Sequence, residues 1–273
     1  MSLSYRTPST AVDRQTNPAL RGYTYLVYAF LYLPIAALVA FSFNAGKSQA
    51  VWQGFSFHWY ATALRNDRIL DCVKSSAIVA TVTSLIATVI GTLAGLALAK
   101  RFPGRGPTAG LVLLPVVIPE IVLGVSLLTF FVPVMGWQPS PGTLMIAHVV
   151  FSLSYVAVVV RARLAGFDRT LEEAARDLGA GPLGVFWRVK FPLILPGVVA
   201  GALLAFTVSV DDYVITSLVY PPGWQTLPLY IYSEVKRGVT PEVNAVSTML
   251  LAATIVMILI AQWLAAPRYS KRG

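Results

Sequence analysis

Long apolar segments set the pattern of this chain. Six of them run for 18 to 28 residues without a lysine or arginine, and their apolar residues are continuous rather than alternating. A helix needs about 20 apolar residues to cross a bilayer, whereas a membrane β-strand alternates apolar and polar positions. The pattern therefore predicts an all-α integral membrane protein with six transmembrane helices. The segments are 23–43, 76–99, 110–135, 143–160, 193–220 and 246–266.

The polar stretches predict one transmembrane domain with a tail at each end. Residues 1–22 precede the first span, the domain occupies residues 23–266, and residues 267–273 follow it. The first apolar segment exceeds the roughly 7–15 residues of a secretory signal. We therefore expect it to remain as an uncleaved span.

Composition agrees with a membrane protein and excludes several functions. Of the 273 residues, 56% are hydrophobic and 12% are charged, against about 25% charged in soluble domains. The net charge of +9 lacks the polar face of a nucleic-acid-binding protein, so no nucleic-acid partner is predicted. Cys72 is the only cysteine, which excludes an intrachain disulfide, and no metal site is predicted. The phosphate loop, the nucleophile elbow and the HExxH motif are absent, so we predict no catalytic residues and no enzyme.

Basic residues are distributed unequally over the segments between the spans. Fifteen Lys and Arg fall in the two tails and in the loops after the second and fourth spans, against six in the remaining loops. Cytoplasmic loops carry the excess of Lys and Arg, so both termini are predicted to be cytoplasmic. The longest cytoplasmic loop is then 161–192, and the basic excess predicts contact with anionic membrane lipid.

Small residues spaced four apart predict where the spans pack. Helices in lipid associate through close contact of small side chains, so one face of the second span and one of the fifth are predicted helix–helix seams. A sliding interface during gating is the alternative. Prolines in the third and fifth spans remove backbone donors and can bend those helices. The small residues are Ala80, Ser84, Ala87, Gly91 and Gly95 in one span and Gly197, Gly201, Ala205 and Ser209 in the other.

The longest cytoplasmic loop contains a predicted short helix. Thr170 and Glu173 have the spacing of a capping box, and acidic residues cluster at the positive end of the helix dipole. Gly179 suits a left-handed helix end and Pro182 the first turn of a second helix. The weakly apolar face of Leu171, Ala174, Ala175 and Leu178 fits a groove on another protein, or else the bilayer surface.

This helix carries a family motif. The string EAARDLG, followed by nine residues and V-K-F-P, resembles the EAA motif of ABC-importer permeases, with Val189 and Phe191 in place of the usual Ile and Leu. In that family the loop is a coupling helix that docks in a cleft of the cytoplasmic ATPase. The resemblance thus implies coupling roles for Glu173, Ala174, Ala175, Asp177 and Gly179.

Most of the chain is similar to spermidine/putrescine permeases, particularly the second of their two permease subunits, and most clearly over residues 209–245. This resemblance implies the type I, MetI-like permease fold in the bacterial cytoplasmic (inner) membrane. It implies a homologous second permease, two ATPase subunits and a periplasmic or lipid-anchored substrate-binding protein. ATP and Mg would be used by the ATPase, and this chain would bind no cofactor. Close relatives also carry opines and other small organic solutes, so the solute stays open between these and a polyamine.

Three carboxylates lie within predicted spans, namely Glu120, Asp211 and Asp212. A charged group at the centre of a span costs roughly 2.5–3.5 kcal/mol, and no span offers a Lys or Arg to offset it. We therefore predict that the three, with Tyr213, favour passage of a cationic solute. Structural hydrogen bonds are the alternative for each carboxylate, and a position near the outer mouth is a further one for the two aspartates. His148 could pair with one of them or join two helices, and a proton relay in a secondary transporter is the competing function.

Overall fold

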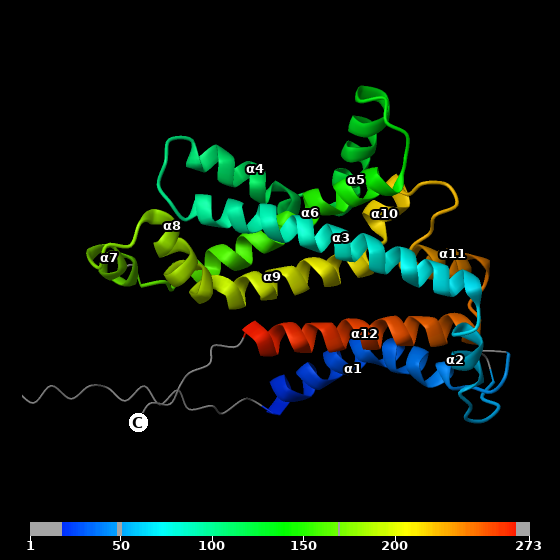
Figure 1. Cartoon of the computed structure of the whole chain (residues 1–273). Coiled ribbons are helices and arrows are strands. Elements are labelled where there is room, and N and C mark those ends of the chain that lie inside the picture. The colour runs from blue at the N-terminus through cyan, green and yellow to red at the C-terminus, as the bar shows by residue number, and fades with distance from the viewer. Residues whose placement is uncertain (1–17, 48–50, 169, 266–273) are drawn as a thin grey trace, which may run out of the picture.

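The computed structural model describes residues 18–47, 51–168 and 170–265, and helices make up most of this part (Figure 1). The predicted C-terminal tail and most of the N-terminal tail lie outside the described residues. The helices are α1 (Pro18–Ser42), α2 (His58–Ala63), α3 (Asp67–Leu98), α4 (Arg105–Val117), α5 (Glu120–Thr129), the π-helical turn η1 (Phe130–Val134), α6 (Pro141–Ala165), α7 (Thr170–Asp177), α8 (Pro182–Val185), the π-helical turn η2 (Phe186–Lys190), α9 (Phe191–Asp211), α10 (Val214–Val219), α11 (Leu227–Arg237) and α12 (Pro241–Ala265).

The number of spans agrees with the prediction, but two of the six are broken. Within the described residues, five helices are long and apolar enough to cross a membrane, and α4 with α5–η1 makes a sixth if that pair is one span. The pair is bent by 110°. Ile118 adopts an extended conformation because the ring of Pro119 disfavours the helical conformation in the residue before it. The predicted span 193–220 also divides, because α9 ends at Asp211 and Asp212 is extended.

Helices α3, α6 and α9 form the centre of the bundle. The predicted small-residue seams of α3 and α9 both face α6, as close packing of helices in lipid requires. A Cβ atom at Gly91 would lie 2.6 Å from the carbonyl oxygen of Leu153, and one at Gly201 would lie 3.2 Å from Val156 Cγ1. The seams therefore do pack helices together, and α6 is their common partner.

Replacing Gly91 with alanine is expected to destabilise the bundle by about 1–3 kcal/mol, because the new methyl group meets backbone that cannot move aside. Gly110→Ala in α4 is the matched control, since a Cβ there meets no atom within 4 Å. Thermal unfolding of the two purified variants in the same detergent measures the difference. Equal melting temperatures would contradict the packing described above.

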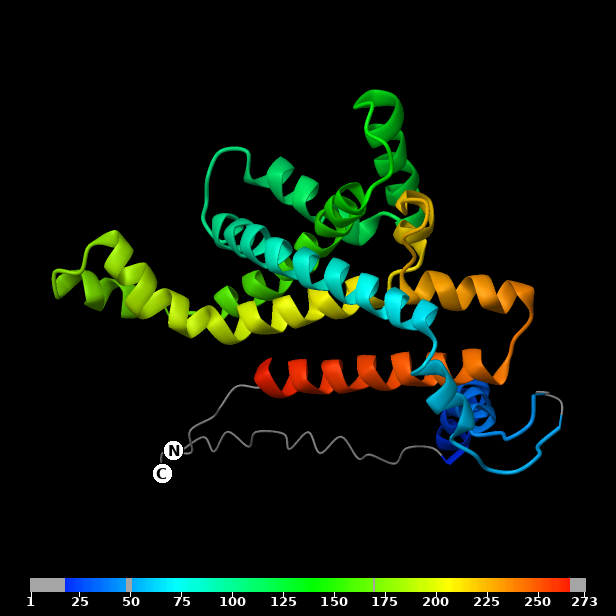
Figure 2. The same cartoon turned by 45° about the vertical axis from the view of Figure 1, so that its right-hand side comes forward.

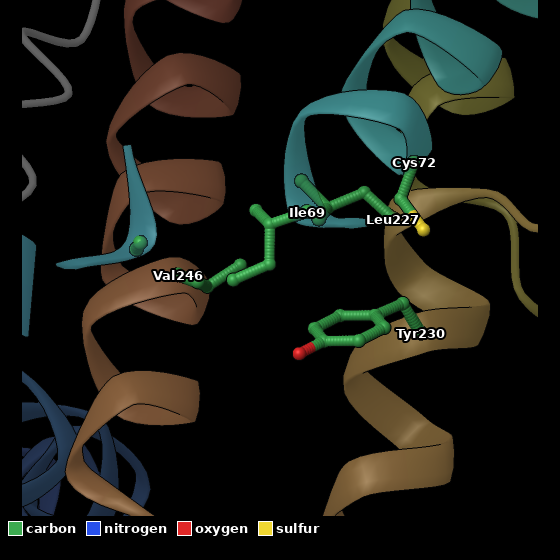
Figure 3. Packing of buried hydrophobic residues seen from close by; sticks show 6 residues of the cluster. Ile69, Cys72, Leu227, Tyr230 and Val246 are labelled. Carbon is green, nitrogen blue, oxygen red and sulfur yellow. The ribbon is translucent and has the colours of Figure 1, made fainter. Parts of the chain in front are cut away.

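A second cluster joins the helices at the other end of α3. Ile69 and Cys72 of α3 pack with Leu227 and Tyr230 of α11 and Val246 of α12 (Figure 3). The backbone N–H of Leu227 also donates to the Ser76 hydroxyl at 2.8 Å. These contacts fix α11 and α12 to the central bundle at the end opposite α7.

Helix α1 lies at the edge of the molecule. It packs on α12 (Figures 1 and 2). The most apolar stretch of 18 residues within Leu20–Ser42 contains no buried residue. Figure 1 shows the beginning of α1, the end of α12 and the short helix α7 at the same end of the bundle. This common end is the arrangement that the loop charges predict for the two chain ends and the 161–192 loop.

Candidate functional site

The beginning of α7 is fixed by Asp168. The helix starts at Thr170, so Thr170 is a helical residue and not the cap that a capping box would require. Its backbone N–H donates to Asp168 Oδ1 at 2.9 Å. This hydrogen bond, aided by one from the Thr170 hydroxyl, holds the pKa of the Asp168 carboxyl below its ordinary value. Glu172 and Glu173 lie in the first turn, where the helix dipole favours negative charge.

The end of α7 follows the prediction. Gly179 has a φ of +83°, and the N–H groups of Gly179 and Ala180 donate to the carbonyls of Arg176 and Ala175 at 2.8 and 3.0 Å. Glycine adopts this left-handed conformation without the steric cost that a Cβ atom brings. The next helix begins at Pro182, as predicted.

The motif residues project from the bundle on this short helix. Glu173, Ala174, Asp177 and Gly179 are exposed and Ala175 is half-buried. The apolar face is open as well, because the side chain of Leu178 is 89% exposed. One ion pair ties the helix to the bundle, with Glu172 Oε1 2.7 Å from Lys190 Nζ. The ion pair thus holds the helix on one side, while the apolar face and most motif residues stay exposed.

Asp212 is buried and hydrogen-bonded within the bundle. Its Oδ2 atom lies 3.3 Å from His148 Nε2 and accepts hydrogen bonds from the backbone N–H and the hydroxyl of Thr216, each at 2.8 Å. His148 Nδ1 lies 2.8 Å from the Ser209 hydroxyl. His148 on α6 therefore both pairs with an acid and joins α9 to α10, which are the two roles that the sequence left open.

Asp211 points away from this cluster toward α12. Its Oδ1 atom accepts a hydrogen bond from the Thr254 hydroxyl at 2.9 Å, and the residue is exposed. Thr254 lies near the middle of α12, which places Asp211 at the depth of the membrane interior. The two adjacent aspartates thus face different surroundings, as the turn of about 100° per helical residue requires.

Glu120 occupies the other helix break. It is the first residue of α5, directly after the bend, and it is exposed. Helices α5 and α10 pack tightly, because a Cβ at Gly124 would lie 2.6 Å from Leu218 Cδ1. The breaks at Pro119 and Asp212 therefore belong to one region, and in membranes such irregular backbone is tolerated where protein buries it or where it lines a water-filled cavity.

Tyr213 stands beside this region on the side of α11. Its ring lies 4.2 Å from the ring of Tyr232, measured between centroids, and the Lys236 ammonium lies 4.6 Å from the Tyr232 centroid. An aromatic face attracts an ammonium group. Sequence reasoning named Tyr213 but missed the hydroxyl partners Thr216 and Thr254, because threonines are common in apolar helices and these two carry no distinctive spacing.

The described residues contain no group of three or more His, Cys, Asp or Glu side chains that could hold a metal ion. The surroundings of Glu120, Asp211 and Tyr213 can instead attract cations by charge and by aromatic faces.

Comparison with known proteins adds a family match. Residues 87–266 match the family described as the binding-protein-dependent transport system inner membrane component. The chain is 42% identical over 254 residues to the putrescine transport system permease protein PotI of Escherichia coli, covering 90% of each protein. It is 40% identical over 253 residues to the spermidine/putrescine transport system permease protein PotC of Shigella flexneri, covering 92% of this chain and 96% of PotC.

Solved structures show the same fold. A chain of a bacterial ABC transporter that imports the acidic polysaccharide alginate matches with a TM-score of 0.73 at 17% identity, covering 93% of this chain and 95% of that chain. A chain of the MetNI methionine ABC transporter matches with a TM-score of 0.60 at 21% identity, covering 72% and 92%.

Proposed function

The chain belongs to the family of binding-protein-dependent transport system inner membrane components, and from this premise we propose that it imports polyamines of the putrescine and spermidine class. The relatives named for these solutes share 40–42% of their residues with it over about 90% of its length. The observation that carries the proposal is the pair of exposed intramembrane carboxylates, Glu120 and Asp211. Both stand at helix breaks, and neither is joined to a cationic side chain in the described part of the chain.

A linear polyamine complements these groups chemically. It carries ammonium groups separated by apolar methylene segments, so it can meet the carboxylates in turn while its methylenes contact apolar walls. The aromatic pair of Tyr213 and Tyr232 offers a further ammonium site, and the position of Lys236 over Tyr232 provides an example within the chain itself. Asp212 supports the site indirectly, because its hydrogen bonds to Thr216 fix the geometry of the α9–α10 break.

Alternating access provides the mechanism. In the proposed assembly this chain pairs with a homologous permease and two ATPase subunits in the bacterial inner membrane, and a substrate-binding protein delivers the solute from outside. The end of the bundle that carries α7 faces the cytoplasm together with both chain ends, as the excess of basic residues favours. Closure of the ATPases on α7, through Glu173, Ala174, Ala175, Asp177 and Gly179, shifts the spans between outward and inward openings.

Coupling is tested by replacing Gly179 with valine in the reconstituted transporter. A β-branched residue in the left-handed conformation costs about 1–2 kcal/mol or more, so we expect polyamine-stimulated ATP hydrolysis and uptake to fall about tenfold. Gly181→Val is the matched control, because Gly181 has a φ of −68° and open space around it, and its activity should stay near wild type.

Three results would count against the proposal. Equal activities of the Gly179 and Gly181 variants would show that the end of α7 has no role in coupling. ATP hydrolysis that ignores binding protein loaded with putrescine or spermidine, but responds to opines or other organic solutes, would reassign the substrate. Uptake driven by a pH gradient without ATP would point to a proton-coupled secondary transporter.

A further inference from the structure

A basic cavity separates α7 from the rest of the bundle. It measures about 590 Å³ and lies between α7, the end of α6 and the connection from α3 to α4. Two carboxylates, Glu172 and Glu173, line it. Five cationic side chains line it as well, and they are Lys100, Arg105, Arg161, Arg176 and Lys190.

The carboxylates leave most of this positive charge unbalanced. Glu172 lies 2.7 Å from Lys190 and 3.8 Å from Arg176, so it serves two cations. Arg105 donates its Nε–H to the carbonyl of Leu98 at 2.9 Å, which leaves the rest of its guanidinium free for a further acceptor. In the described part of the chain, Lys100 and Arg161 form no ion pair and no side-chain hydrogen bond.

Burial makes the unbalanced charge significant. Arg105 and Arg161 are half-buried, and a partly desolvated cation is costly unless an anion accompanies it. Guanidinium groups present planar pairs of donors that fit the oxygens of a phosphate. The cavity therefore has the charge and the donor groups of a phosphate site.

The depth of the cavity indicates the source of the phosphate. Helix α3 ends at Leu98 and α6 at Ala165, so the cavity opens where these spans leave the apolar layer. Ala99, Leu164 and Phe167 line its apolar portion, beside the cations. A phospholipid presents this same combination of phosphate and apolar chain at this depth, whereas a free phosphate ion would leave the apolar portion unused.

We infer that this cavity binds the phosphate of an anionic phospholipid in the leaflet that α7 faces. The identity of the leaflet rests on the orientation proposed above, whereas the binding itself is independent of the transported solute. Because Glu172 and Arg176 belong to α7, the bound headgroup bridges the coupling helix to the α3–α4 connection. The lipid thus becomes part of the support that holds α7 in position.

Binding of short-chain phosphatidylglycerol and phosphatidylcholine to the complete transporter, measured by native mass spectrometry, tests this inference. Each basic group near an anionic membrane surface corresponds to about fivefold in affinity. We therefore expect Lys100→Gln combined with Arg161→Gln to weaken phosphatidylglycerol binding about 30-fold. Arg101→Gln is the matched control, since Arg101 is exposed on the same connection but does not line the cavity.

The outcomes separate the possible occupants. Preference for phosphatidylglycerol that the double variant loses and Arg101→Gln retains supports the inference. Displacement of that lipid by millimolar inorganic phosphate supports a phosphate site in the cavity, but it overturns the assignment to a lipid and makes a free anion the occupant. Equal binding of both lipids to the complete transporter overturns the inference, as would happen if the ATPase filled the cavity. Polyamine-stimulated ATP hydrolysis would be unaffected by that outcome. An equal loss in Arg101→Gln overturns the inference as well.

Discussion

A transporter with alanine in place of Asp212 is expected to lose its assembly. The substitution leaves the buried His148 ring without its acid and removes the acceptor for the first N–H groups of α10. Each buried donor left without an acceptor costs about 1–3 kcal/mol, and the substitution affects several of them, against a total stability of roughly 5–15 kcal/mol for a folded protein. Loss of the α9–α10 geometry would also displace α5, which packs on α10.

Asp211→Ala is the control that isolates this effect. The two residues are adjacent and chemically identical, but Asp211 is exposed and its described partner is the single hydroxyl of Thr254. Its stability should therefore change by less than about 1.5 kcal/mol. Co-purification of the ATPase and thermal unfolding in detergent provide the measurements.

A double-mutant cycle with His148→Ala tests the pairing itself. Because the two side chains stabilise each other, the double variant should lose less stability than the sum of the two single variants. Normal assembly and unaltered melting of Asp212→Ala would show that the buried contact contributes little.

The two aspartates have different surroundings, and their partners could not be predicted from the sequence. Adjacent helical residues point about 100° apart, and Asp212 follows Ser209 of the small-residue seam by three residues, so the sequence places Asp212 nearer that seam than Asp211. The partner of Asp212 was not evident, because His148 lies on another helix and a lone histidine in a span has several uses. Only the packing of α6 against α9 and α10 brings His148 and Thr216 to the Asp212 carboxylate.

Features set by local physics were predictable from the sequence. The length of the apolar runs indicated the spans, and a glycine followed by a proline marked the end of α7 and the start of α8. The bend at Pro119 was predictable as an event, but its angle of 110° depends on how α5 packs against α10. The exposure of α1 was likewise not predictable, because apolar composition does not distinguish a helix facing lipid from one facing protein.

Neutralising Glu120 and Asp211 is expected to abolish polyamine uptake while the transporter still assembles. A hydrogen bond to a charged group contributes about 1.5–3 kcal/mol, so Glu120→Gln and Asp211→Asn should each reduce uptake of labelled putrescine or spermidine about 10- to 100-fold. Both side chains are exposed, and neither substitution leaves a buried group unpaired. Co-purification of the ATPase and basal ATP hydrolysis should therefore remain near wild type.

Asp71→Asn is the control for the loss of a negative charge. Asp71 is exposed near the beginning of α3 and lies 3.1 Å from Lys74, so its charge is already balanced and it stands at neither helix break. Uptake by this variant should match wild type.

If uptake by the Glu120 and Asp211 variants also matched wild type, the carboxylates at the breaks would not form the cation path. If the variants lost uptake and assembly together, Glu120 and Asp211 would be structural groups rather than parts of the cation path. Loss of uptake with assembly intact is the result that assigns the cation path to these two carboxylates, because buried Asp212 is already matched by His148 and Thr216.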